Sequence, residues 1–361
     1  MARLASTAHL YTPHTLGQKL TRMFEGLSDK PRNIMERVDG VFEGCNYEDL
    51  IRMLEPSFVR FLAKYDIKNI TNVTHTGDNS FVVLADITNK TRGSVCSVAI
   101  KLFFCMNNSV DTSYLSKTSV SPTIVFRDEV PSCQMIYNTP TILVTQQCTP
   151  FRCYVYTTFS SVKVAIMSGL QKVVLMHHRI THCDLKLENI VVGDDGELFL
   201  IDFDNCGELS TGRERACDFS MSSSECYIPR NLEQLCVKRR MAREGPDMMC
   251  MLFVLLGYVI DMDFWKLMDG KDHPDGSVDW KMLGEKERCT SRLNRKVLLK
   301  HIMKTIHDKF PAEVLEEKDV GFLRGFCDFV HLHCIDTAEY DANDTYRARR
   351  DEVLDVLTSN M

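Results

Sequence analysis

The chain has 361 residues, of which 44% are hydrophobic and 25% are charged, and its net charge is −6. This length exceeds one typical domain and this composition supports a globular core, so wholesale disorder is excluded. A mildly acidic chain also gives no reason for general nucleic-acid binding, and we expect no nucleic-acid partner.

The 15 cysteines are scattered along the chain and form no C-x-x-C pair. This spacing argues against a structural zinc site. Reduced, buried thiols are typical of an intracellular protein, so we expect a cytoplasmic or nuclear location. No apolar run reaches the roughly 18 residues that a membrane-spanning helix needs. We therefore expect no membrane span, and interpret the longest run, residues 248–260, as a buried helix.

Residues 1–66 are predicted to form an N-terminal helical extension. The stretch "YEDLIRMLEPSFVRFLAKY" repeats apolar residues at helical spacing, with an interruption at Pro56. Residues 1–24 contain basic residues and no acid, a composition also seen in organellar transit peptides. We favour an ordinary helix, because "LGQKLTRMFEGL" continues with amphipathic spacing.

The period of the apolar residues changes from about residue 67. The segments "NSFVVLADI", "GSVCSVAIKLFF", "TPTILVTQQC" and "FRCYVYTTF" are predicted to be strands. Helical spacing returns in "SVKVAIMSGLQKVVLMHHR", and the chain is mostly helical from about residue 232. The sequence therefore predicts an α+β, two-lobed fold. A small β-rich N-lobe (about 67–158) precedes a larger α-helical C-lobe (about 159–345), and a C-terminal helix or tail covers 346–361.

The stretch "RITHCDLKLENIVVGDDGELFLIDFDNCGEL" carries the densest group of polar residues. Asp184, Lys186 and Asn189 lie on a predicted loop that follows a long helix. "NIVVG" and "LFLID" then form a predicted hairpin around an Asp-Gly turn, which returns Asp202 to the neighbourhood of Asn189. An amide and a carboxylate oxygen suit Mg²⁺, so we predict Asn189 and Asp202 as metal ligands. Asp184 remains to take or orient a hydroxyl proton.

These motifs resemble those of the eukaryotic protein-kinase family, whose catalytic loop is H-R-D-x-x-x-x-N and whose metal motif is D-F-G. Here they stand as "HCDLKLEN" and "DFD". The resemblance implies a two-lobed fold with ATP and Mg²⁺ (or Mn²⁺) between the lobes. It also implies that Lys186, two residues after Asp184, neutralises charge on the transferred phosphate, as in serine/threonine-specific members.

The predicted N-lobe carries the matching "VAIK", which ends at Lys101 within a predicted strand. In the family this lysine holds the α- and β-phosphates and pairs with an acid on the next helix. We assign that acid to Glu129, with Asp128 as the alternative. The resemblance places a glycine-rich loop one hairpin before the lysine, where "TGDNSFVVLA" retains only the first glycine, Gly77. Side chains at the other positions imply looser cover of a nucleotide.

The resemblance also implies that Asp247, at the start of the buried helix, braces the catalytic loop by hydrogen bonds. The predicted catalytic residues are Asp184, Lys186 and Lys101. The predicted cofactor-binding residues are Gly77, Asn79, Phe81, Leu84, Ala99, Lys101, Glu129, Asn189 and Asp202.

The resemblance predicts a serine/threonine protein kinase that transfers the γ-phosphate of ATP to a protein substrate. The divergent, compact stretch at residues 159–168 suggests a fast-evolving, viral enzyme. Two alternatives remain open. The poor glycine-rich loop and the Asp204 of "DFD" favour a pseudokinase that serves as a binding or scaffold module. The same "LIDFD" is also typical of small-molecule phosphotransferases of the aminoglycoside- or choline-kinase type.

Overall fold

The structure is a computed structural model of the whole chain, and it describes ten stretches of it. These are residues 60–75, 80–103, 115, 118–127, 142–182, 184–203, 206–208, 245–262, 295–332 and 343–361. The chain divides into two compact units. The first comprises residues 1–109 and 122–147, and the second comprises residues 110–121 and 148–361.

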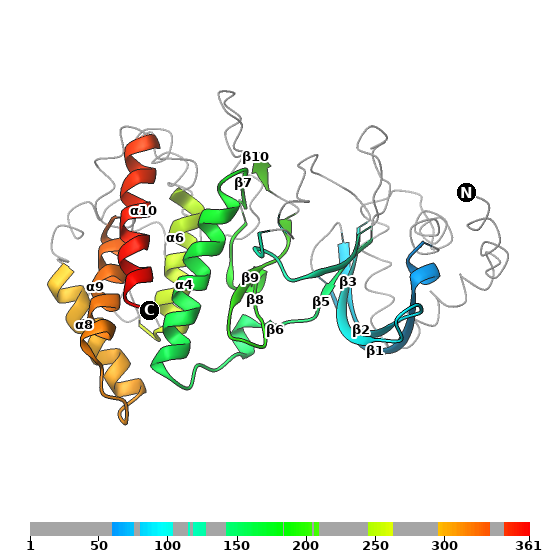
Figure 1. The fold of residues 1–361 in the computed structure, drawn as a ribbon, viewed down its shortest axis with the longest axis horizontal. Coiled ribbons are helices and arrows are strands. Elements are labelled where there is room, and N and C mark those ends of the chain that lie inside the picture. Colours follow the sequence, from blue (N-terminus) through cyan, green and yellow to red (C-terminus); the bar gives the residue numbers. More distant parts are fainter. Residues whose placement is uncertain are drawn as a thin grey trace. The chain divides into compact units, whose positions relative to one another are not determined.

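The first unit contains an antiparallel sheet of five strands (Figure 1). The strands are β1 (Tyr65–His75), β2 (Ser80–Asn89), β3 (Val95–Phe103), β4 (Ile124–Arg127) and β5 (Ile142–Gln146). Their order across the sheet is β1-β2-β3-β5-β4. The pairing of β2 with β3 confirms the predicted hairpin around "TNKTRG", and it sets Leu84 opposite Ala99 and Val82 opposite Lys101.

The two faces of this sheet differ in exposure because side chains alternate along each strand. One face is buried, and its residues are Val83, Ala85, Ile87, Val98, Ile100, Ile142 and Val144. The other face is half-exposed, and it includes Val82, Leu84, Ala99, Lys101 and Leu143. The predicted nucleotide-binding residues on β2 and β3 therefore alternate with core residues.

Three aromatic rings join the edges of the sheet at one end. The rings of Phe61 and Phe126 lie 5.3 Å apart between centroids, and those of Tyr65 and Phe126 lie 6.4 Å apart. The Tyr65 hydroxyl donates to the Val125 carbonyl at 3.2 Å. Because β1 and β4 are opposite edges of the sheet, this contact requires a strongly coiled sheet. The helical residues 60–64, just before β1, supply the fully buried Phe61.

The second unit is mostly helical, as predicted for the later part of the chain. Its helices are α4 (Phe159–Met176), α6 (Gly245–Val254), α8 (Arg295–Lys309), α9 (Glu317–Val330) and α10 (Asn343–Ser359), and the π-helical turn η8 (Leu255–Val259) continues α6. Two short sheets accompany them. One contains β6 (Thr149–Pro150), β8 (Ile190–Val192) and β9 (Leu198–Leu200), and the other pairs β7 (Ile180–Thr181) with β10 (Gly207–Glu208).

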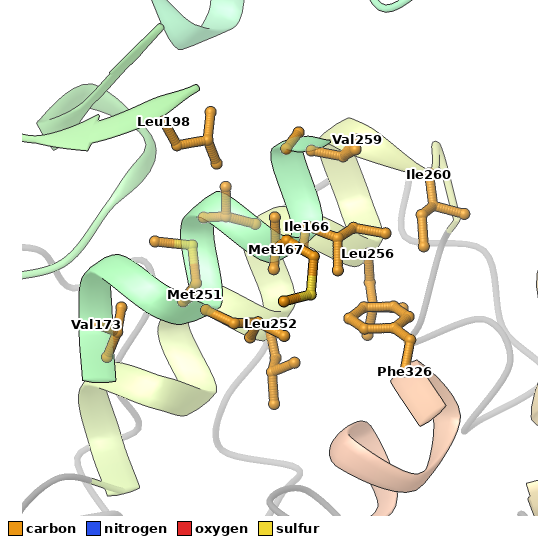
Figure 2. Close-up of a cluster of buried hydrophobic side chains, with 14 of the residues drawn as sticks. Ile166, Met167, Val173, Leu198, Met251, Leu252, Leu256, Val259, Ile260 and Phe326 are labelled. Atoms are coloured by element: carbon orange, nitrogen blue, oxygen red, sulfur yellow. The ribbon is translucent and has the colours of Figure 1, made fainter. Parts of the chain in front are cut away.

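Helix α4 is the centre of the second unit's core. Figure 2 shows its Ile166 and Met167 packed among apolar side chains of α6 and η8. A Cβ at Gly169 would lie only 3.0 Å from the Met251 sulfur and 3.2 Å from a Leu198 methyl carbon. A glycine therefore allows α4 to approach both α6 and β9 closely. By length and composition α4 could span a membrane, but most of it is buried, as in the core helix of a folded domain.

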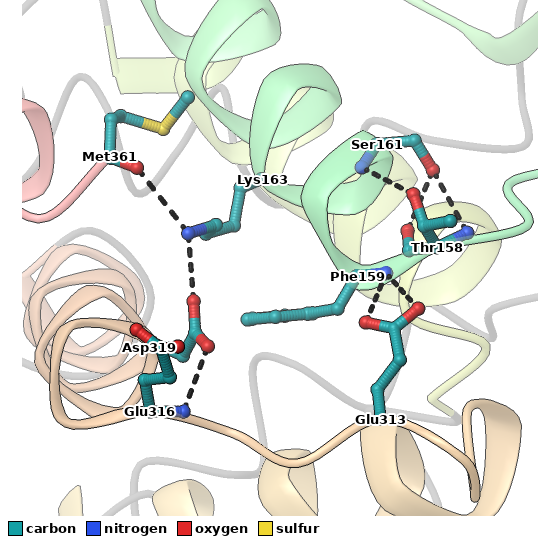
Figure 3. A network of polar contacts seen from close by, with 8 residues as sticks. All are labelled: Thr158, Phe159, Ser161, Lys163, Glu313, Glu316, Asp319 and Met361. Carbon is teal, nitrogen blue, oxygen red and sulfur yellow. Dashed lines mark hydrogen bonds and ion pairs between the residues drawn. The ribbon is translucent and has the colours of Figure 1, made fainter.

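A polar network fixes the beginning of α4 (Figure 3). The Thr158 side chain accepts from the Ser161 backbone N–H at 3.1 Å, and the Ser161 hydroxyl accepts from the Thr158 N–H in return. The Phe159 N–H donates to the Glu313 carboxylate at 3.1 Å. Lys163 Nζ donates to Asp319 of α9 at 2.7 Å and, over 3.4 Å, to the Met361 carbonyl.

Two expected elements differ from the structure. The predicted strand 151–159 is a 3₁₀ turn, η4 (Phe151–Cys153), followed by chain without strand pairing up to α4. Thr158 is the N-cap of α4 and Phe159 is its first residue, so the end of this stretch belongs to the helix rather than to a strand. Residues 125–127, expected to begin the short helix that bears Glu129, belong to strand β4 instead.

The boundaries of the units also differ from those predicted. The chain changes unit at 147–148 rather than 158–159, and residues 110–121 belong to the second unit. Strand β1 begins at Tyr65, inside the predicted helical extension, and α10 begins at Asn343, before the predicted tail.

Candidate active site

The candidate site lies on the loop that leads from α4 to the β8–β9 hairpin. Helix α4 ends at Met176, and β7 pairs with β10 before the loop begins. The 3₁₀ turn η5 (Leu187–Asn189) then closes the loop, with the Asn189 N–H donating to the Lys186 carbonyl at 2.9 Å. The β8–β9 hairpin follows as predicted, and Gly196 of its turn has a φ of +84°. The hairpin turn reverses the chain, so that the end of β9 lies beside the loop.

Three of the predicted residues contact one another on this loop. Asp184 Oδ2 accepts from Lys186 Nζ at 2.9 Å and from Asn189 Nδ2 at 3.2 Å. Asn189 Nδ2 also donates to the Asp184 carbonyl at 2.8 Å. The Asp184 side chain is 3% exposed and that of Lys186 is 21% exposed. The carboxylate is thus held in one orientation by two donors, and the lysine that holds it reaches solvent.

The orientation of the Asn189 amide follows from the same contacts. A backbone carbonyl can only accept a hydrogen bond, so the atom next to the Asp184 carbonyl must be the NH₂ group. The amide oxygen Oδ1 therefore faces away from Asp184. An oxygen in this position is a suitable ligand for a hard cation.

Asp202 follows β9 and lies close to Asn189 along the backbone. The Ile201 N–H donates to the Asn189 carbonyl at 2.9 Å. Asp202 itself has a φ of +66°, a left-handed conformation that is uncommon for residues other than glycine. Strain of this kind persists only where surrounding contacts hold it, and it often marks functional sites. An amide oxygen and a carboxylate are ligand types that Mg²⁺ accepts, and Mg²⁺ uses few protein ligands, so Asn189 and Asp202 remain the predicted pair.

A buried carboxylate on α6 holds the beginning of the loop. Asp247 Oδ2 accepts from the His182 backbone N–H at 2.7 Å and contacts His177 Nε2 at 3.1 Å. The hydrogen bond to the loop confirms the brace expected of Asp247. Burial alone would raise the pKa of Asp247, but the hydrogen bond and charge of His177, with the contacts of His182, outweigh it and lower the pKa.

His182 links the loop to the end of β9. Its Nε2 lies 3.0 Å from the Ile201 carbonyl, which can only accept, so Nε2 carries the proton. Its ring also lies 4.9 Å from that of Phe203 between centroids. His182 therefore supports the chain on both sides of Asp202 rather than acting as a base.

The first unit holds the other predicted site residues, and the structure describes only some of them. Lys101, Ala99 and Leu84 lie on the half-exposed face of the sheet, and Phe81 is paired with Leu102 in the same hairpin. Gly77, Asn79, Glu129, Asp128 and Asp204 fall outside the described residues. The pairing of Lys101 with an acid therefore stays a prediction.

One supporting residue was not assigned a role from the sequence. This residue is His177, the C-cap of α4. Its side chain is 1% exposed and contacts Asp247, 70 residues away. No local pattern predicts such a contact, although a histidine at the end of an apolar helix is a weak signal of a buried polar partner.

The described residues contain no group of three or more His, Cys, Asp or Glu side chains that could hold a metal ion. The assignment of Asn189 and Asp202 as metal ligands stays a prediction. Neither a scan against protein-family models nor a search of curated proteins found a match to this chain.

Proposed function

We propose that the chain is a serine/threonine protein kinase with the two-lobed protein-kinase fold, which transfers the γ-phosphate of ATP to a protein hydroxyl. One observation carries the proposal. A single loop holds Asp184, Lys186 and Asn189 in mutual hydrogen bonds, and the same loop is bonded to the strand end that presents Asp202. The residue types and their spacing suit phosphoryl transfer, which depends on positioning and charge stabilisation.

Asp184 orients the acceptor hydroxyl and takes its proton. Its carboxylate is fixed by two donors, so the acceptor meets a base of constant geometry. Lys186, partly exposed, reaches the transferred phosphoryl group and balances the negative charge that develops on it. Asn189 and Asp202 would hold Mg²⁺, which neutralises the phosphate oxygens.

The first unit supplies the nucleotide anchor in this proposal. Lys101 stands on the half-exposed face of β3, with Ala99 two residues before it on the same face. Leu84 pairs with Ala99 from β2 and adds apolar surface beside it. A small apolar surface next to a lysine suits a base and its phosphates.

The test is transfer of labelled γ-phosphate from ATP to a general protein acceptor by the purified full chain. Asp184→Asn should lower the rate about 10²- to 10⁴-fold, the usual contribution of a positioned base. Lys101→Met should lower it about 10²-fold or more, because one phosphate contact is lost. Both variants should remain folded, shown by a cooperative thermal unfolding transition.

Matched controls separate these effects from general loss of charge. Asp195 lies in the exposed β8–β9 turn and Lys90 in the turn between β2 and β3. Asp195→Asn and Lys90→Met should leave the rate unchanged. Equal rates in wild type and Asp184→Asn would contradict the proposal. Nucleotide binding without transfer would instead favour the pseudokinase, and transfer only to small acceptors the small-molecule phosphotransferase.

A further inference from the structure

A short piece of chain from the middle of the first unit belongs to the second unit. Residues 110–121 lie between β3 and β4 in the sequence, yet they group with the second unit. We call them the crossover segment. The structure describes Leu115 and residues 118–121 of it.

The described residues of the crossover segment close a turn. The Val120 N–H donates to the Leu115 carbonyl at 3.2 Å, and Ser119 between them has a φ of +55°. In a Schellman motif the N–H of one residue donates to the carbonyl five residues earlier, and the residue just before the donor is left-handed. Leu115, Ser119 and Val120 follow this pattern. Such motifs pair the apolar residues at the two ends of the bond. Here Leu115 and Val120 are 2% and 0% exposed, and both belong to the core that surrounds α4.

The closed turn is bonded to the strand that carries the candidate metal ligand. The Leu200 N–H, at the end of β9, donates to the Val120 carbonyl at 2.9 Å. The next residue, Ile201, is bonded through its N–H to Asn189 and through its carbonyl to His182. Asp202 follows directly in its left-handed conformation. Three backbone groups of Leu200 and Ile201, directly before Asp202, are therefore fixed, and the first of them is fixed by the crossover segment.

We propose that Val120 is a positioning residue, and that the crossover segment sets the place of Asp202 by holding Leu200. The same segment continues into β4 of the first unit, because Ile124 is four residues after Val120. The effect on metal binding rests on the proposed phosphotransfer function, whereas the bond between Val120 and Leu200 does not.

The alternative is that the crossover segment only fills the core. Three variants of the full chain distinguish the two. Val120→Ala removes the apolar anchor of the turn and should loosen it. Ser119→Gly replaces a left-handed serine by the residue that adopts this conformation without strain, and should tighten the turn. Val330→Ala, at an equally buried valine of α9, is the matched control for lost apolar volume.

The first measurement is amide hydrogen exchange of residues 198–203, with α4 as internal reference. Val120→Ala should speed exchange at Leu200 about tenfold relative to α4, because local opening becomes easier. Ser119→Gly should slow it, and Val330→Ala should leave the ratio unchanged. An unchanged ratio in Val120→Ala and Ser119→Gly, or an equal rise in Val330→Ala, would overturn the proposal. If Val120→Ala does not fold, Ser119→Gly alone still decides.

The second measurement is the magnesium concentration that gives half-maximal phosphate transfer. Val120→Ala should raise it about tenfold, as supporting residues of metal ligands commonly do, with little change in the maximal rate. Faster exchange at Leu200 without this rise would show that the bond does not position Asp202, and would overturn the positioning role. If the wild type transfers no phosphate, the proposed function fails, while hydrogen exchange still decides whether the crossover segment holds β9.

Discussion

The two units hold their candidate site residues in different ways. In the first unit, Leu84, Ala99 and Lys101 are spaced along paired strands, and the strand register sets Leu84 opposite Ala99. In the second unit, Asp184 and Asn189 are joined by hydrogen bonds within one loop. The first arrangement is as stable as the sheet that carries it, whereas the second depends on a few buried polar contacts.

The two arrangements therefore differ in how strongly a single substitution disturbs the positions of the site residues. Strand register is fixed by many apolar side chains, so no single one of them determines the position of Lys101. The loop of the second unit depends on Asp247, which is buried and accepts hydrogen bonds from two histidines. Buried polar networks lose much stability when one member is removed, because the remaining groups stay unpaired.

The largest effect on stability is therefore expected for Asp247→Ala. The His182 N–H and the His177 ring would lose an acceptor that lies at 2.7 and 3.1 Å. Breaking a buried pair by removing one partner costs about 3–5 kcal/mol. We expect a loss of this size in the free energy of unfolding, measured by urea denaturation.

Asp247→Asn is the control, because it keeps the shape and an acceptor oxygen. It should cost less than Asp247→Ala while removing the charge. A loss below about 1 kcal/mol for Asp247→Ala would mean that the loop is held by its own short-range contacts, and the contrast between the units would disappear.

The predictions from sequence succeeded where the contacts are local. The β2–β3 and β8–β9 hairpins were predicted from apolar alternation and turn residues, and α4 from its helical spacing. Strand β4 was missed, because four edge residues give little pattern and depend on β5 for pairing. Strand β1 was not predicted either. Its sequence is polar, and two register shifts in its pairing with β2 interrupt the regular alternation of side chains.

The site follows the same rule. Asp184, Lys186 and Asn189 lie within six residues of one another, so their contact could be expected from the sequence. The contact of His177 with Asp247 and that of Val120 with Leu200 join distant parts of the chain. The fold alone determines such contacts, and neither was anticipated.

A smaller effect is expected for the ion pair of Lys163 and Asp319, which joins α4 to α9 (Figure 3). Burial alone would raise the pKa of Asp319, but hydrogen bonds from Lys163 and from the Glu316 N–H outweigh it and lower the pKa. A carboxyl with a lowered pKa stabilises the fold fully above its unfolded pKa near 3.8, and this contribution is lost as the pH falls through the folded value.

Lys163→Met should therefore destabilise the protein by about 1.5 kcal/mol at pH 7, the value of a hydrogen bond to a charged group. The difference from wild type should begin to shrink as the pH falls below about 4, and it should disappear as the pH passes the lowered pKa of Asp319, because the wild type then loses the ion pair. Urea denaturation at pH 7, 4 and 3 measures this, with Lys163→Arg as the charge-conserving control. A difference that stays constant with pH would assign the role of Lys163 to packing against the Phe159 ring.

The smallest effect is expected in the turn between β2 and β3, and it tests whether the units respond separately. Asn89 Oδ1 accepts from the N–H groups of Thr91 and Arg92 at 2.9 and 3.0 Å, which fixes the turn. Asn89→Ala should cost about 0.5–1 kcal/mol, the net value of exposed hydrogen bonds of this kind. Hydrogen exchange should speed up in β2 and β3, because the turn anchors both strands. It should not change in α4, which belongs to the other unit.

Asn89→Asp keeps the acceptor oxygen and should restore the wild-type pattern. An equal rise in α4 would show instead that the two units open together, and that the sheet and the loop share one cooperative structure.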